Sequence, residues 1–247
     1  MLGFLATFMW VMSNVTHAQS FRPPDHSTQL IIAMGTTTQT SAVVVERYTR
    51  ADAASPWTAV GESFPARIGK NGMAWGLGLH GTPPEGARHK QEGDWRAPIG
   101  MFEIGQAFGD GPVAPQGSQW PYRTVTTQDL WVEDASAPTY NQHIVVPQTR
   151  PLTAWEESQR MKMGDPAHAL KIVIGHNLTK PAVPGAGSAI FMHIWRDNGN
   201  RPTSGCTAMA RGDIERVLQW LSADAKPVFV MLDAALRTHA RAAGDLP

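Results

Sequence analysis

The residues with the clearest chemical potential are Cys206, the only cysteine in 247 residues, and His193, one loop before it. Cys206 lies in Thr203-Ser204-Gly205-Cys206-Thr207-Ala208, where small neighbours leave its sulfur uncrowded and Gly205 allows a sharp bend. A thiol is nucleophilic as its thiolate, so it needs a neighbouring base or positive charge. His193 lies in an apolar run typical of a buried strand and could supply that base. Two interpretations remain open: a nucleophile–base pair, or a buried thiol beside an unrelated histidine.

The histidine shares its strand face with aromatic side chains. Successive side chains of a strand point to opposite faces. One face of this run carries Ile190, Met192 and Ile194, and the other carries Phe191, His193 and Trp195. Aromatic neighbours would shield the imidazole from water and shift its pKa. The nearby cysteine loop favours a functional histidine over a core histidine packed among aromatics.

The order of histidine, loop and Ser/Thr-Xaa-Gly-Cys resembles the signature of the L,D-transpeptidase catalytic domain, also called the YkuD-type domain. Members of that family form or break amide bonds in peptidoglycan stem peptides through a cysteine thioester. The resemblance implies that Cys206 is the nucleophile, His193 the general base, and Gly205 part of the oxyanion hole. It also implies that the backbone carbonyl of Ile194 orients the imidazole.

Two positions depart from the usual family pattern, which is Ser/Thr-His-Gly-Cys, an apolar residue, then Arg or Asn. Ser204 stands where the family has that His, and Ala208 stands where it has the Arg. The family Arg is placed to pair with a substrate carboxylate, a contact worth roughly 1.5 to 3 kcal/mol. Ala208 cannot make this contact, and Arg201, just ahead of the motif, is either a substitute cation or a solvated loop residue.

The variant pattern Ser-Xaa-Gly-Cys-Xaa-Ala predicts a particular linkage. It resembles a proteobacterial branch that joins the first stem residue, L-alanine, to meso-diaminopimelate, whereas most of the family joins two diaminopimelates. Both donors present an L–D amide bond, so the chemistry at the cysteine would be unchanged. Only the register in which the donor is bound would differ.

The resemblance extends over roughly residues 29 to 232. Further matching stretches are residues 65–72, 97–102, 140–142, 175–177 and 185–188. Residues 120–141 interleave aromatic with acidic side chains, which suits either a cleft for a peptide bearing amines or aromatic packing beneath a long loop. The predicted substrate-binding residues are Thr203, Ser204, Ala208, Arg201, Tyr140, Asn141 and Trp131.

The elements that must position these residues are mostly strands. Short apolar or β-branched runs predict strands at Gln29–Met34, Ala42–Tyr48, Phe64–Ile68, Gly76–His80, Met101–Ile104, Leu170–Gly175 and Val228–Leu232. Thr153 and Glu156 are spaced like a capping box, which favours a helix over 153–163. A second helix is predicted over 213–221, where Ile214, Val217, Leu218 and Leu221 form one apolar face.

The predicted fold is therefore mainly β: a β-sandwich with a few peripheral helices, which the resemblance also implies. Residues 29–232 would form the catalytic domain, and 233–247 a peripheral tail. Apolar residues make up 42% of the chain, enough for a sizeable core.

Composition limits the possible partners. Lys+Arg and Asp+Glu both number 21, so the net charge is zero, and neither nucleic acid nor a membrane surface is expected as a partner. The chain has no His-Glu-Xaa-Xaa-His and no second cysteine. We therefore expect no metal and no cofactor, and predict peptidoglycan stem peptides as donor and acceptor.

Residues 1–18 are typical of a secretory signal peptide. An apolar run from Leu2 to Met12 is followed by polar residues and by Ala18, which suits cleavage. The run is too short to span a bilayer comfortably, so no membrane span is expected in the mature chain. An exported chain with an unpaired thiol favours a reactive cysteine, and we predict a periplasmic enzyme.

Three alternative functions can be compared with this prediction. The same site could hydrolyse L–D bonds as a carboxypeptidase or endopeptidase. The chain could be an inactive peptidoglycan-binding β-domain, although a decayed enzyme commonly loses one of the pair His193 and Cys206. A papain-like protease is disfavoured because there the cysteine precedes the histidine.

Overall fold

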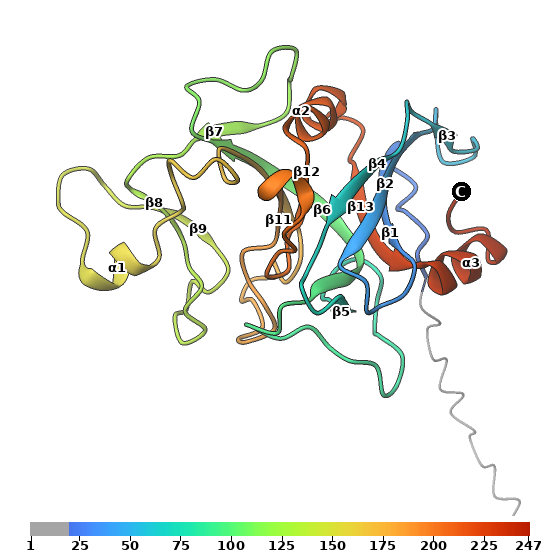
Figure 1. The fold of residues 1–247 in the computed structure, drawn as a ribbon, viewed down its shortest axis with the longest axis horizontal. Coiled ribbons are helices and arrows are strands. Elements are labelled where there is room, and N and C mark those ends of the chain that lie inside the picture. The colour runs from blue at the N-terminus through green and yellow to red at the C-terminus, as the bar shows by residue number, and fades with distance from the viewer. Residues whose placement is uncertain (1–19) are drawn as a thin grey trace, which may run out of the picture.

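The computed structural model describes residues 20–247, in which one large sheet carries most of the chain and three α-helices lie at its periphery (Figure 1). The predicted leader, residues 1–18, lies outside the described residues. The strands of the large sheet are β1 (Gln29–Gly35), β2 (Ala42–Thr49), β3 (Thr58–Ala59), β4 (Phe64–Arg67), β5 (Met73–Trp75), β6 (Ala97–Gly109), β7 (Tyr122–Thr124), β10 (Leu170–Ile174), β11 (Phe191–Ile194), β12 (Thr207–Met209) and β13 (Val228–Asp233).

The remaining elements are a small sheet and the helices. The small sheet pairs β8 (Asp129–Trp131) with β9 (His143–Val145), and the helices are α1 (Ala154–Ser158), α2 (Arg211–Trp220) and α3 (Ala234–Ala242). A 3-10 turn, η1 (Asp197–Gly199), lies between β11 and β12. Within the described part of the chain, none of the helices has the length and apolar character needed to cross a membrane.

The large sheet closes on itself around one apolar core. Its strands run in the order β1-β13-β6-β10-β11-β12-β4-β2, and β2 pairs back with β1. Opposite parts of the sheet therefore face each other across buried residues such as Ile32, Phe102 and Met192, all without solvent exposure. The mainly β architecture with peripheral helices confirms the predicted fold class.

The central strands β10, β11 and β12 present two different faces. Cross-strand pairing places Lys171 opposite His193, and His193 opposite Ala208. Paired residues point to the same side of a sheet. Ile172 and Met192, which also pair, point to the other side and belong to the main core. The predicted alternation along the histidine strand is thus confirmed.

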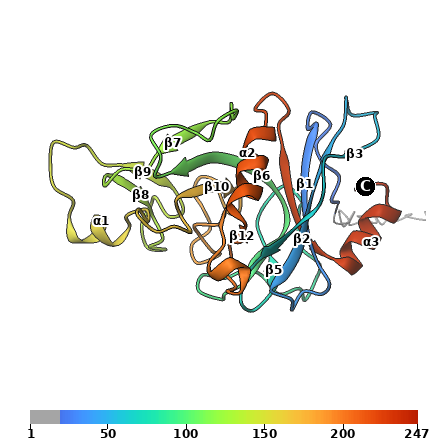
Figure 2. The same cartoon turned by 45° about the horizontal axis from the view of Figure 1, so that its top comes forward.

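A lobe built from residues 120–168 stands beside the outer face of these strands. The lobe contains β8, β9 and α1, which lie together at one side of the large sheet in Figures 1 and 2. A second apolar cluster joins lobe and sheet through Phe108, Trp131, Met161, Val173 and Phe191. The lobe therefore forms one wall over the face that carries His193.

Two predicted elements, a strand and a helix, differ from the structure. The predicted strand Gly76–His80 is an irregular segment that follows β5, and its Gly76 N–H and Leu79 N–H donate to carbonyls of β6. A Cβ at Gly78 would lie 2.3 Å from the Met101 carbonyl oxygen, so only glycine allows this approach. The predicted helix over 153–163 has the expected capping box at Thr153 but ends at Ser158.

The segment after Asp233, predicted as a peripheral tail, contains the helix α3, which lies at the periphery of the sheet and is packed against it. The Asp233 side chain caps α3 by accepting from the Leu236 N–H. Arg237 forms an ion pair with Glu46, at 2.5 Å between Nη1 and Oε2, and also donates to the Tyr48 hydroxyl. These contacts and the burial of Ala240 and Leu246 attach α3 to the main core.

Candidate active site

Cys206 lies in the loop that leads directly into β12. Its Sγ is 3.4 Å from the Phe191 backbone nitrogen, which donates to it, and 3.4 Å from the Ala189 carbonyl oxygen, to which the thiol donates. Gly205 before it has φ of +154°, and a Cβ there would lie 2.9 Å from the Arg96 carbonyl oxygen. The glycine therefore lets the loop pass close to a neighbouring backbone and bring the thiol against β11.

His193 is held in one orientation by its own strand. Its Nδ1 lies 2.7 Å from the Ile194 carbonyl oxygen, which is the contact that the resemblance implied. A carbonyl only accepts hydrogen bonds, so Nδ1 must carry the proton. In the neutral imidazole Nε2 then keeps its lone pair, which is the form required of a general base.

The register of β11 and β12 brings the two residues to the same face. His193 pairs with Ala208, so Cys206, two residues earlier, lies level with Phe191. Cys206 and His193 are therefore diagonal neighbours on one side of the sheet. Both line a single cavity of about 600 Å³ between the large sheet and the lobe.

Burial keeps both groups neutral in the unliganded site. It lowers the pKa of His193 to about 4, an effect that the hydrogen bond to Ile194 opposes. Burial also raises the pKa of the Cys206 thiol to about 11, while the hydrogen bond from Phe191 opposes this rise. At neutral pH the site holds a free imidazole base beside a protonated thiol, so a proton must move as the nucleophile attacks.

A second histidine packs on the first. The rings of His168 and His193 are stacked, with centroids 4.8 Å apart and an angle of 24° between their planes. Burial, and then the charge that His193 would carry, lower the pKa of His168 to about 3. The Ile194 N–H donates to the Ala167 carbonyl oxygen at 3.1 Å, which holds the segment that carries His168 against β11. The stacked ring of His168 in turn restricts the orientation of His193.

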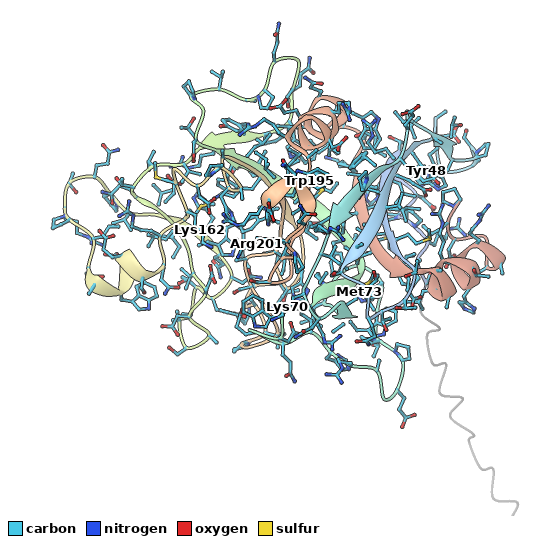
Figure 3. The ribbon with its side chains drawn as sticks, in the orientation of Figure 1. Tyr48, Lys70, Met73, Lys162, Trp195 and Arg201 are labelled. Atoms are coloured by element: carbon cyan, nitrogen blue, oxygen red, sulfur yellow. The ribbon has the colours of Figure 1, made fainter. Side chains whose placement is uncertain are left out.

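The cavity wall carries charges of both signs. Lys162 follows α1 in the lobe, whereas Arg201 precedes β12, and both are labelled in Figure 3. Further cations are Arg160, Lys171 and Arg196, and the carboxylates are Glu92 and Glu133. The pKa of Glu133 is raised, first by loss of hydration and then by the charge of Glu92. The cavity can therefore accommodate a ligand that bears both amines and carboxylates.

Most predicted substrate-binding residues line this cavity: Arg201, Thr203, Ser204, Ala208 and Trp131. Thr203 also shapes the loop, since its Oγ1 accepts from the Gly205 N–H at 3.1 Å and donates to the Cys206 carbonyl oxygen at 2.6 Å. The Gly205 N–H would therefore have to leave Thr203 before it could bind an oxyanion.

Tyr140 and Asn141 are not among the lining residues, contrary to expectation, because they lie behind the cavity wall. Asn141 is 1% exposed, and its Oδ1 accepts from Trp131 Nε1 and from the Ala189 N–H, each at 3.0 Å. The Tyr140 hydroxyl donates to the Glu92 carboxylate at 2.6 Å. These two residues support residues that line the cavity instead of forming its surface.

Glu133, one of the acids of the predicted cleft segment 120–141, lines the cavity, whereas sequence reasoning missed the lining residues Glu92, Trp95, His168 and Lys171. Of these, only Lys171 left a signal in the sequence, a lone cation inside the apolar run Leu-Lys-Ile-Val-Ile. The others come from loops whose path depends on tertiary contacts. Among residues 20–247, no group of three or more His, Cys, Asp or Glu side chains is arranged to hold a metal ion.

Comparison with known proteins identifies one family. The family model of the L,D-transpeptidase catalytic domain (YkuD) matches residues 48–230, which is most of the chain and includes both His193 and Cys206. No curated protein and no solved structure gave a match.

Proposed function

Because the chain belongs to the L,D-transpeptidase catalytic-domain family, we propose that it is a peptidoglycan L,D-transpeptidase with Cys206 as nucleophile and His193 as base. The observation that carries the proposal is the joint placement of these residues on one sheet face, with the imidazole held as the Nδ1–H tautomer. Activity on peptidoglycan is what the family implies. The individual roles of the residues are our assignment.

The proposed reaction is acyl transfer in two steps. His193 Nε2 takes the thiol proton as the sulfur of Cys206 attacks the carbonyl on the L side of an L–D amide bond. The backbone N–H of Cys206 and that of Gly205, once it has left Thr203 Oγ1, bind the oxyanion, an effect typically worth about 3 kcal/mol per donor. The imidazolium then returns its proton to the departing amine, which leaves a thioester. In the second step an acceptor amine attacks the thioester and regenerates the thiol.

The charge pattern of the cavity supports a peptide substrate with free amines and carboxylates. Glu92 and Glu133 suit an ammonium group, and the surrounding cations suit carboxylates. Ala208 lies directly beside His193 and leaves space at the position where the family pattern has an arginine. The motif Ser-Xaa-Gly-Cys-Xaa-Ala resembles that of the proteobacterial branch that uses L-alanine, and on this resemblance we assign the product as a bridge from L-alanine to meso-diaminopimelate.

Two alternative functions would give different results in the muropeptide test described below. Water in place of the acceptor amine would make the protein an L,D-carboxypeptidase or endopeptidase with the same thioester. A chain that binds peptidoglycan without reacting would be a binding domain. The proposed place of action is the periplasm, in keeping with the apolar leader in residues 1–18.

The direct test is mass spectrometry of muropeptides after the purified protein is incubated with isolated sacculi. We expect new dimers linked from L-alanine to diaminopimelate, and none with Cys206→Ala. Dimers linked solely between two diaminopimelates would overturn the assigned linkage. Shortened monomers without dimers would identify the hydrolase. An inert thiol without any product would identify the binding domain.

The Ala208→Arg variant tests the assigned donor register, because it restores a cation beside His193. We expect this variant to lose yield of the L-alanine linkage, since the added side chain occupies the space left by Ala208. An Ala208→Arg protein that gained activity without any change in linkage would contradict the role of this position.

A further inference from the structure

Lys171 is a buried cation in the middle of β10. Its side chain is 2% exposed, in a strand whose other residues are apolar and buried. Cross-strand pairs place it between Phe108 of β6 and His193 of β11, on the face that carries the active-site cavity. It lines that cavity together with Cys206.

The ammonium group has little that compensates its burial. Lys171 Nζ donates to the Lys162 carbonyl oxygen at 3.2 Å and lies 6.0 Å from the Phe191 ring centroid. Lys90, also buried, forms an ion pair with Asp94 at 2.5 Å. By contrast, none of the ion pairs formed within residues 20–247 includes Lys171.

A buried charge without an ion-pair partner reduces stability, and an apolar side chain of similar length would fit between aromatic neighbours at lower cost. Lys171 is therefore poorly explained as a structural residue. Its position is instead suited to act on a charge that appears nearby during the reaction. The only group of this face that becomes an anion in the proposed reaction is the Cys206 thiol.

We propose that Lys171 is a positioning residue whose ammonium group favours the thiolate form of Cys206 while disfavouring protonation of His193. The inference rests on the proposed function only in taking Cys206 as the nucleophile. Lys171 stays protonated and transfers no proton. It acts through the electric field at the thiol, across the strand β11, which separates β10 from the Cys206 loop.

The couplings at this site agree in sign with that role. The Cys206 thiolate raises the pKa of Lys171, and by linkage the ammonium favours the thiolate. The charges that act most on the pKa of Cys206 itself are Glu133, which raises it, and Lys162 and Lys90, which lower it. The Lys171 charge also lowers the pKa of His193. Burial lowers the pKa of Lys171 itself to about 8, so its charge is present at neutral pH and is lost as the pH rises through 8.

Other charges around Lys171 must be considered in any pH profile. Those that act on it are Asp110, which follows β6, and Lys162 and Asp165, which precede β10. His168 faces it from the same segment, and Cys206 and His193 face it from the neighbouring strands. His168 and His193 are neutral above pH 5 because their pKa values are about 3 and 4, so neither titrates with Lys171.

The test is the rate of Cys206 alkylation by iodoacetamide from pH 6 to pH 10, which needs no peptidoglycan. The lone cysteine makes the reading unambiguous. Lys171→Met should react roughly tenfold more slowly than the wild type at pH 7, and the two profiles should converge above pH 8, where wild-type Lys171 has lost its charge. Lys171→Arg keeps the charge at all these pH values, so it should follow the wild type below pH 8 and react faster than the wild type above pH 8.

Controls keep the result interpretable. Lys180→Met removes an exposed lysine outside the cavity and should leave the profile unchanged. If Lys171→Met fails to fold, judged by near-ultraviolet circular dichroism, Lys171→Gln provides a polar replacement for the same measurement. A neutral variant that folds and keeps the wild-type profile overturns the proposal, including one with a raised KM, which would make Lys171 a substrate-binding residue. Normal alkylation without any muropeptide product would instead refute the transpeptidase assignment alone.

Discussion

Met192 and His193 are adjacent in β11, yet their side chains enter opposite environments. Met192 has no solvent exposure and belongs to the closed apolar core, together with its pairing partner Ile172. His193 is almost as well buried, but its row across the sheet contains Lys171 and Ala208 and borders a cavity. One short strand thus contributes to stability on one side and to chemistry on the other.

The difference shows how the fold can accommodate a site whose burial lowers the free energy of unfolding. Fully burying a side chain such as Met192 stabilises a protein by roughly 1.5 to 3 kcal/mol. Burying the imidazole and the ammonium on the outer face has the opposite sign, because both groups lose hydration. Burial on the apolar face therefore offsets the cost of the polar face, and the strand pairing keeps His193 and Cys206 in fixed register.

The largest expected effect comes from removing the sulfur of Cys206 alone, because this should change activity without reducing stability. Cys206→Ala deletes the nucleophile and should abolish product, while its urea midpoint should stay at or above the wild-type value because a poorly hydrated polar atom is lost. Muropeptide analysis and urea unfolding measure the two quantities. Residual product above trace level would break the assignment of Cys206 as nucleophile.

The matched pair His193→Gln and Met192→Ala tests the comparison directly. Glutamine cannot accept the thiol proton, so we expect activity to fall by about 10² to 10⁴ with folding retained. Met192→Ala should instead lower the free energy of unfolding by about 2 to 5 kcal/mol, with activity per folded molecule retained. Equal losses of activity in both variants would show that the two faces are not functionally distinct.

Acid sensitivity is expected to come mainly from the chemical face. The folded-state pKa of His193, about 4, lies below the ordinary value of 6.5, so protonation favours the unfolded chain. Stability from this group is full above pH 6.5 and is lost as the pH falls toward 4. His193→Gln should abolish that part of the loss, about 3 kcal/mol at pH 4.

Urea midpoints measured between pH 4 and pH 7 check this expectation. His168 and His176 have lowered pKa values of about 3 and about 4, so they should preserve some acid sensitivity in the variant. Parallel curves for wild type and His193→Gln would mean that folding does not lower the pKa of His193.

The local features of the site were predictable because they depend on neighbouring residues. The alternation of β11 and the capping box at Thr153 are each set by short-range geometry, and the contact between His193 and the Ile194 carbonyl was implied by the family resemblance. The prediction of a strand at Gly76–His80 was wrong because two glycines in this segment pack closely against β6 in place of regular strand pairing. The sequence analysis did not predict the helix α3, because Ala-rich and Arg-rich composition does not reveal that Arg237 is buried against Glu46.

By itself the sequence determined the family and the mainly β class, and it singled out His193 and Cys206 as the proposed base and nucleophile, since each inference rests on residue types and their spacing. Only the tertiary structure decided which distant residues surround that pair. Lys171 and His168 reach His193 through strand pairing and ring stacking, and Asn141 lies behind the wall because its amide holds Ala189 in place. Such placement depends on which strands pair and in what register, and these are set by burial and hydrogen bonding over the whole sheet.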